Sequence, residues 1–184
     1  MTKNVENIRI FGGEDDRISC AAIGSTLPTT LADPAAPFAD LGWLGEDGIT
    51  ITPNASITKF KGHQGARIVR TKVTESGTSF KFQCLETTAL TLGLQLNIKT
   101  SETTAGLTTM KLGSGYNVLP RAFVVDGYDA DDADKQLRLA IPRGEIGERS
   151  EFKLANSDLT VFEYTVEIIG DFFLLSNDPA LASA

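Results

Sequence analysis

The chain has 184 residues, 41% of them hydrophobic and 22% charged, which suits a single domain over residues 1–184 with one continuous core. Its formal net charge of −7 argues against a nucleic-acid-binding protein, because phosphate affinity depends on concentrated Lys and Arg. The apolar stretches are too short for a bilayer-spanning helix and no signal peptide is visible, so we expect neither membrane residence nor export.

Charge is distributed unevenly along the chain. Residues 51–100 carry seven basic and two acidic side chains, whereas residues 1–50 carry three basic and eight acidic ones. Residues 151–184 carry one basic and six acidic side chains. The middle of the chain is therefore basic and both ends are acidic, and opposed charge blocks of this kind favour head-to-tail contacts between copies of one chain.

The first third of the chain predicts short strands and a proline-rich segment. Alternation of apolar and polar residues predicts strands at residues 8–11, 18–23, 49–51 and 57–60. Residues 25–39 contain three prolines among small residues and predict an extended arm instead of a core element. We expect this arm and the acidic terminal segments to be flexible in the free subunit and to become ordered on a neighbouring one.

The central region predicts a basic β-hairpin. Residues 67–75 alternate apolar and polar side chains and are rich in β-branched types, which suit a pleated surface. Residues 79–85 repeat the alternation, and the stretch between them has the composition of a turn. We therefore expect two strands joined by a turn at residues 75–78.

A helix is best supported at residues 87–96. Thr87 or Thr88 can act as its N-cap, and Leu90 and Leu94 lie one turn apart on the same face. The glycine and threonines within this segment lower its intrinsic helix propensity. Its formation is therefore expected to depend on packing against the rest of the protein.

The last third predicts more strands, and with them a fold class. The expected strands are residues 107–112, 121–125, 136–141, 151–154 and 162–168. The last is the clearest, because every second residue from Phe162 to Ile168 is apolar and defines one face. The pattern predicts a mainly β fold, a β-sandwich or barrel of antiparallel strands with one flanking α-helix.

Residue types that enzymes use are sparse. His63 is the only histidine and stands in a Gly-flanked polar loop, which is typical of a surface residue, with a general base as the alternative. Cys20 and Cys84 have no CxxC spacing, so we expect two reduced, structural thiols. Gly113-Ser114-Gly115 lacks the spacing of a nucleophile elbow. We therefore expect no catalytic or cofactor-binding residues and no enzymatic activity.

For two further features, the sequence is compatible with either a binding role or a structural role. The acidic stretch Asp126–Asp134 offers the carboxylates that hard cations prefer, but counting from Asp129 places Asp134 and Ala140 where an EF-hand loop needs glycine and glutamate. A solvated loop is favoured and no metal site is predicted. Trp43 is either a sugar-stacking residue or, more commonly, a core or interface anchor.

Two runs of sequence define a resemblance to a known family. They are EDGITITPNASITKFKGHQGARIVRTKVTESGTSFKFQCLET, from Glu46 to Thr87, and QLRLAIPRGEIGERSEFKLANSDLTVFEYTVEI, from Gln136 to Ile168. Together they resemble the major tail protein, or tail tube protein, of long-tailed bacteriophages of the siphovirus type, particularly those of actinobacterial hosts. In that family a GW-L-x-EDG turn, a charged hairpin, an LET helix start and a later IPRGE-like turn occur in this order. One departure is His63, where the family leads us to expect tryptophan.

This resemblance implies a structural virion protein with a β-sandwich and a flanking helix. Six copies would close into a ring, and stacked rings would form the tail tube that conducts genomic DNA during ejection. The implied partners are copies of the chain itself, other tail proteins, and DNA that passes through the lumen without sequence-specific binding. Neither a cofactor nor a membrane is implied, and the protein would be assembled in the host cytoplasm and reside in the virion.

The charge pattern adds a hypothesis for the assembly contacts. The basic hairpin is expected to meet acidic side chains of adjacent subunits instead of DNA. The residues assigned to this interface are Lys59, Lys61, Arg67, Arg70, Lys72, Glu163 and Glu167. Two alternatives stay open: a β-sandwich module of a phage particle that binds carbohydrate or a host-surface protein, and a jelly-roll hydrolase, which the single histidine disfavours.

Overall fold

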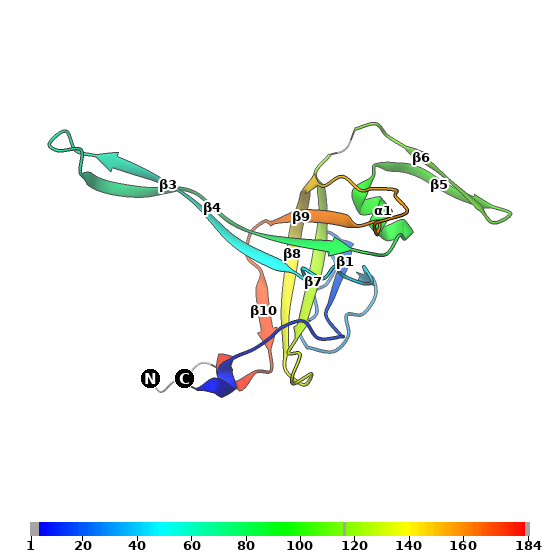
Figure 1. The fold of residues 1–184 in the computed structure, drawn as a ribbon, viewed down its shortest axis with the longest axis horizontal. Helices are drawn as coiled ribbons and strands as arrows, with labels where there is room; N and C mark the ends of the chain where they lie inside the picture. Colours follow the sequence, from blue (N-terminus) through cyan, green and yellow to red (C-terminus); the bar gives the residue numbers. More distant parts are fainter. Residues whose placement is uncertain (1–3, 116, 183–184) are drawn as a thin grey trace.

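Long antiparallel strands dominate the fold (Figure 1). The computed structural model describes residues 4–115 and 117–182. The strands are β1 (Arg17–Ala22), β2 (Ala39–Asp40), β3 (Thr50–Lys61), β4 (Ile68–Cys84), β5 (Ile98–Thr104), β6 (Leu107–Leu112), β7 (Leu119–Tyr128), β8 (Gln136–Arg149), β9 (Phe162–Ile168) and β10 (Phe173–Ser176). The helical segments are η1 (Val5–Asn7), α1 (Ala89–Gln95) and η2 (Pro179–Leu181). A mainly antiparallel β fold with one flanking α-helix is thus confirmed for the described residues.

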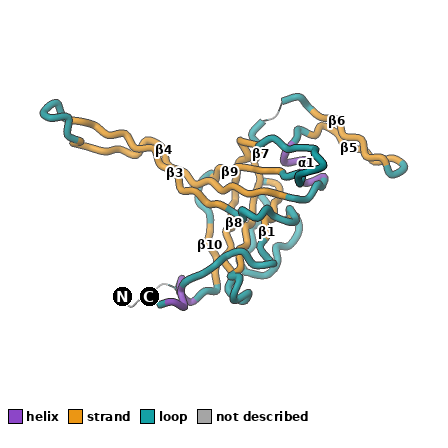
Figure 2. The backbone as a smooth tube through the Cα atoms, in the orientation of Figure 1, coloured by secondary structure: helices purple, strands orange, loops and turns teal. Residues whose placement is uncertain are grey.

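Strand β8 organises the main sheet, whose order is β2-β1-β7-β8-β9-β4-β3. The first half of β8 pairs with β10 through Leu137–Ala140, and its second half pairs with β9 from Gly144 to Arg149. Strands β9 and β10 therefore leave β8 in different directions. As a result, β9 and β4 cross over β1, β7 and β8 as a second layer (Figure 1, Figure 2).

The apolar core lies between these two layers. The Phe80 ring on β4 meets the Phe123 ring on β7 edge-on, with centroids 5.4 Å apart, and the Tyr164 ring on β9 lies 5.3 Å from that of Phe82. The alternating face predicted for the last clear strand is confirmed, since its four apolar side chains are buried. They are Phe162, Tyr164, Val166 and Ile168.

Helix α1 closes one end of the core. Thr88 is its N-cap, and the Thr88 hydroxyl accepts a hydrogen bond from the backbone N–H of Thr91 at 3.1 Å. Leu94 is buried, and the Tyr164 hydroxyl donates to the Thr91 carbonyl at 2.8 Å. Arg149 donates to the Leu94 carbonyl at 2.6 Å. The predicted helix is thus confirmed, and it forms where tertiary contacts support it.

The predicted turn at residues 75–78 is wrong. Strand β4 continues through these residues, because β3 runs beside each of them as an antiparallel partner. The hairpin turns instead at residues 62–67, and the strands predicted at residues 49–51 and 57–60 merge into β3. A long-range backbone ladder here overrides the turn composition of the local sequence.

Three further local predictions also differ from the structure. Residues 151–154 form no strand, and within residues 8–11 only Phe11 makes an isolated bridge, to Asp129. The IPRGE-like turn is part of β8. A Cβ at Gly144 would lie 2.7 Å from a Val166 methyl carbon and 2.8 Å from the Phe123 ring, so this glycine leaves room for side chains of the two neighbouring strands instead of making a turn.

The proline-rich segment lies against the body of the subunit. Residues 25–38 contain no regular strand or helix, as predicted from the prolines. Arg138 donates to the carbonyl oxygens of Thr30 at 2.6 Å and Ala32 at 2.7 Å, which attaches the segment to β8. Ordering of this segment on a neighbouring subunit stays a prediction.

The two ends of the described chain lie side by side (Figure 1). The Arg9 guanidinium donates to both carboxylate oxygens of Asp178, at 2.6 and 3.0 Å. The predicted flexibility of the terminal segments is untested, and it concerns in part residues 1–3 and 183–184, which lie outside the described residues.

Candidate assembly surfaces

The hairpin of β3 and β4 projects from the body as a two-stranded arm (Figure 1). Strand β4 pairs with β9 only from Thr78 to Cys84, so beyond that point β3 and β4 pair only with each other. Every residue of β3 is exposed, and so is every residue of β4 up to Gly77. We call residues 54–77 the basic arm.

The basic arm brings together the five basic residues that the sequence assigned to an assembly interface. They are Lys59, Lys61, Arg67, Arg70 and Lys72. Arg70 lies opposite Phe60 and Lys72 lies opposite Thr58, so these four side chains share one face of the ribbon. Lys59 lies on the other face. Glu75 is the only acidic residue of the arm, so the arm as a whole is strongly basic.

The basic arm also carries apolar side chains that are exposed to solvent. Phe60 is 48% exposed on one face, and Ile57 lies opposite the 56%-exposed Val73 on the other. Strand β3 is an edge of the main sheet, so its outer backbone groups face away from other strands of the described chain. A two-stranded ribbon is only marginally stable by itself, and such an edge invites pairing with another chain. The arm therefore has the features of a surface that is covered by a partner.

The tip of the basic arm carries His63. The loop closes through a hydrogen bond from the Gly62 N–H to the Arg67 carbonyl at 2.8 Å. Gly65 and Ala66 both adopt positive φ angles, of 70° and 51°, which turn the chain. His63 is exposed, which agrees with the surface role expected for it.

A second hairpin, residues 98–112, projects from the other end of the body (Figure 1). Its strands β5 and β6 pair only with each other, and Leu107 near its turn is 70% exposed. The sequence predicted β6 but missed β5, because the residues from Lys99 to Thr104 are polar on both faces and show no alternation.

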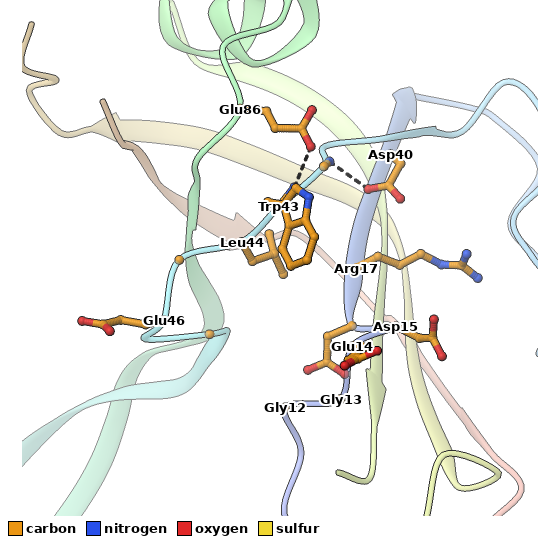
Figure 3. Close-up of a pocket in the computed structure, with 14 residues that line it drawn as sticks. Gly12, Gly13, Glu14, Asp15, Arg17, Asp40, Trp43, Leu44, Glu46 and Glu86 are labelled. Atoms are coloured by element: carbon orange, nitrogen blue, oxygen red, sulfur yellow. Dashed lines mark hydrogen bonds between the residues drawn. The ribbon is translucent and has the colours of Figure 1, made fainter. Parts of the chain in front are cut away.

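An open pocket of about 640 Å³ lies beside the start of β1 (Figure 3). It is formed by the segment leading into β1, by the end of β2, by residues 42–48 and by Glu86. Its acidic lining residues are Glu14, Asp15, Asp16, Asp40, Glu46 and Glu86. We call it the Trp43 pocket, after the only tryptophan of the chain, which also lines it.

Trp43 is held by its backbone while its indole ring stays open to solvent. The backbone N–H of Trp43 donates to a Glu86 carboxylate oxygen at 3.1 Å, and the backbone carbonyl of Trp43 accepts from the Leu85 N–H at 2.9 Å. The Asp40 carboxylate accepts from the Gly42 N–H at 2.9 Å. Trp43 is 73% exposed and its ring projects between these segments (Figure 3), so a core role for Trp43 is wrong and an interface or ligand role remains.

The Trp43 pocket is electrostatically unbalanced. Within the described part of the chain, no ion pair includes any of its six carboxylates. Arg17 lines the pocket but pairs with Asp126 at 3.0 Å and with Asp33 at 2.6 Å. Burial raises the pKa of the Asp16 carboxyl above its ordinary value, the direction expected where the charged form is disfavoured. The pocket therefore favours a cationic partner.

The two acidic residues assigned to the interface lie on β9, where Glu167 is opposite Ser79 at the base of the basic arm and Glu163 is opposite Gln83. Glu163 is engaged internally, because Ser150 donates to it at 2.6 Å, Gln83 at 3.0 Å and Lys81 at 2.9 Å. These hydrogen bonds lower the pKa of Glu163 to about 2, and the bond from Ser150 has the largest effect. Glu167 is exposed. Their assignment to an interface stays a prediction.

The acidic stretch from residue 126 to residue 134 is only partly a solvated loop. Asp126 belongs to β7 and is fully buried, where Arg138 holds it with two hydrogen bonds of 2.5 and 2.8 Å. Asp129 is also buried, and its carboxylate lies 3.5 Å from Arg9. Local sequence could not reveal this, because both arginine partners lie on other segments. In the described residues, no three His, Cys, Asp or Glu side chains are grouped to hold a metal ion.

Both cysteines are buried in the core as free thiols. Burial raises the pKa of Cys20 to about 11 and that of Cys84 to about 12, so neither is a thiolate at neutral pH. Among the helices that the structure describes, none is long and apolar enough to cross a lipid bilayer.

A well-packed core with two exposed hairpins on separate sides is typical of a structural subunit that assembles through its surface. Residues 1–173 match the model of a family described as phage tail tube protein, and the chain belongs to that family. It is therefore a structural component of a phage tail. No curated protein sequence matches the chain.

Proposed function

We propose that six copies of this chain close into a ring and that rings stack into the tail tube through which the phage genome passes during ejection. The observation that carries the proposal is the basic arm, an exposed ribbon that projects from an otherwise acidic subunit. Head-to-tail rings require two different complementary surfaces on each copy. An arm on one side and an acidic body on the other supply such a pair.

The net charge supports passage of DNA without retention. Each chain carries a formal charge of −7, and a closed ring multiplies this charge by the number of its subunits. A wall of the same sign as the phosphate backbone offers few of the counterion-releasing contacts that hold DNA. We accordingly assign the basic arm to protein contacts, with genomic DNA passing the lumen without sequence-specific binding.

The same reasoning makes the protein a structural element with no catalytic role. The tube subunit is assembled in the host cytoplasm and resides in the virion, in a tail of the long, siphovirus type. Its partners are further copies of itself and other tail proteins, and no membrane contact is part of the proposal. The family membership and the exposed hairpins support this assignment.

Electron microscopy of the purified protein tests the proposal. We expect annular particles with sixfold symmetry or stacked tubes, and a sedimentation mass that is a multiple of six times 19.7 kDa. A protein that remains monomeric across concentration and ionic strength, with no rings in the images, would refute it.

A charge-reversal variant tests the partner of the basic arm. Arg70→Glu combined with Lys72→Glu is expected to impair assembly or make it salt-dependent, while DNA affinity stays negligible in both proteins. Normal tubes together with loss of a measurable DNA affinity would show that the arm faces the genome.

A second candidate function is favoured by one observation, the exposed indole of Trp43 beside carboxylates. A sugar ring can stack on such an indole while carboxylates accept hydrogen bonds from its hydroxyls. In that case the chain would be a β-sandwich module that binds carbohydrate, or a host-surface protein, on the phage particle. Saturable quenching of the protein's fluorescence by soluble oligosaccharides, without rings in the microscope, would support it.

A further inference from the structure

Among the described residues, two surfaces of opposite charge are defined by basic or acidic side chains that form no salt bridges. The basic arm carries five basic side chains against one acidic side chain. The Trp43 pocket is lined by six carboxylates, none of which forms an ion pair in the described part of the chain. Each surface also has an exposed aromatic ring, Phe60 on the arm and Trp43 in the pocket. The two surfaces are therefore complementary in charge and both hold apolar area to be covered.

The arm is placed to reach another molecule and not its own pocket. Residues 54–61 of an extended strand span roughly 25 Å at about 3.3 Å per residue. The arm runs outward from the body (Figure 1), whereas the Trp43 pocket lies on the body beside the start of β1. Pairing of β3 with β4 along the arm, interrupted only by two register shifts, keeps the ribbon extended. Contact between the two surfaces thus requires a second copy.

We infer that the basic arm of one copy docks into the Trp43 pocket of a neighbouring copy, with the Trp43 ring as the central contact. This inference rests on the proposed self-assembly and names the surface that receives the arm. The occupant is a second copy of this chain, and its recognised part is the face that carries Arg70 and Lys72 beside Phe60.

The chemistry of this contact follows from the side chains. An indole is the best aromatic acceptor for a guanidinium or ammonium group, and its wide exposure leaves its face available. Burying tryptophan at the centre of an interface, with charges at the rim, is the usual arrangement of a binding hot spot. Carboxylates around the ring then orient the basic arm and speed its association more than they add affinity.

Trp43 makes the contact directly measurable, because it is the only tryptophan of the chain. The free subunit is expected to show the red-shifted emission and strong acrylamide quenching of an exposed indole. On assembly of the wild-type protein, the emission should shift to shorter wavelength and the quenching constant should fall several-fold. Assembled rings or tubes in which Trp43 remains as quenchable as in the free subunit would overturn the inference and leave the proposed function standing.

Paired charge reversals test whether the two surfaces meet. Arg70→Glu with Lys72→Glu on the arm, or Asp15→Lys with Glu46→Lys in the pocket, should each raise the concentration needed for assembly roughly tenfold or more. A chain that carries all four substitutions should recover assembly, because the charges are exchanged between the surfaces. Failure of this chain to recover, when each pair alone impairs assembly, would contradict direct contact.

A matched control is available elsewhere on the surface. Glu151→Lys with Asp158→Lys reverses two exposed acidic residues outside the pocket and should leave assembly unchanged. An equal loss in this control would show that net charge, and not the pocket, governs assembly, and would overturn the inference.

Binding of a sugar to the pocket is the competing outcome. If soluble chito-oligosaccharide or glucan quenches Trp43 while the pocket reversal leaves assembly intact, the pocket is a carbohydrate site and the inference fails. If the wild-type chain forms no rings at all, the proposed function fails with it.

Discussion

Replacing Asp126 by alanine is expected to cost about 3–5 kcal/mol of folding free energy, because it leaves a buried guanidinium without its counter-ion. Arg138 and Asp126 are both fully buried, and their two hydrogen bonds measure 2.5 and 2.8 Å. Without Asp126, Arg138 keeps only the carbonyl oxygens of Thr30 and Ala32, which carry no full charge. Arg17 and Gln136 lose an acceptor at the same time.

Urea denaturation followed by far-UV circular dichroism measures this loss on the unassembled subunit. The melting temperature should fall as well, by about 2–4 °C for each kcal/mol in a chain of this size. The matched control is Glu145→Ala, which removes the same type of charge from an arginine pair on β8. Its partner Arg143 has a side chain that is half exposed, so this pair should contribute only about 0–1 kcal/mol.

The reasoning would be refuted if Asp126→Ala were no more destabilising than Glu145→Ala. A second variant tests the attachment of the proline-rich segment, which depends on Arg138. Arg138→Met removes the hydrogen bonds to the carbonyl oxygens of Thr30 and Ala32, so thermolysin should cut within residues 25–38 faster than in the wild type. Unchanged cleavage there would mean that other contacts hold the segment.

Three further predictions follow from burial and hydrogen bonding. Phe162→Ala should cost about 3–5 kcal/mol, because Phe162 is fully buried, and a wild-type melting temperature would contradict this. Cys20 and Cys84 should resist a thiol reagent in the folded protein and both react after denaturation; fast native reaction would show an open core. Because the pKa of Glu163 is lowered from 4.5 to about 2, its ionised form should stabilise the fold above pH 4.5, and this contribution should be lost as the pH falls toward 2. In Glu163→Gln the free energy of unfolding should therefore change less with pH between these two values.

The sequence was most informative where a side chain's environment follows from its immediate neighbours. The alternation from Phe162 to Ile168 correctly identified a buried face, and so did the row Phe80, Phe82 and Cys84. Thr88 was correctly identified as a possible N-cap, because capping depends on residues within one turn. These elements could be predicted because period and capping are local properties.

Long-range pairing explains what local patterns could not predict. The stretch of residues 75–78 has turn composition, yet β3 holds it extended. Both faces of the arm are exposed, so its alternation carries no information about the core. The local sequence places Asp126 in an acidic loop, because its partner Arg138 lies on the neighbouring strand and cannot be found from adjacent residues. The Trp43 pocket was missed for the same reason, because its acidic residues come from segments that are far apart in the chain.

In the proposed assembly, stability and subunit contacts are carried by different parts of this molecule. The buried apolar residues lie on β1, β4, β7, β8 and β9, together with Leu41 and Leu94, and none lies in the basic arm. Because exposed substitutions change folding free energy little, arm and pocket residues are free to vary under selection for contacts alone. The exposed ribbon would be an aggregation hazard in a protein that acts as a monomer. In the assembly we propose, neighbours cover the ribbon, so the same exposure becomes the means of assembly, and we expect the uneven charge along the sequence to determine which surfaces meet.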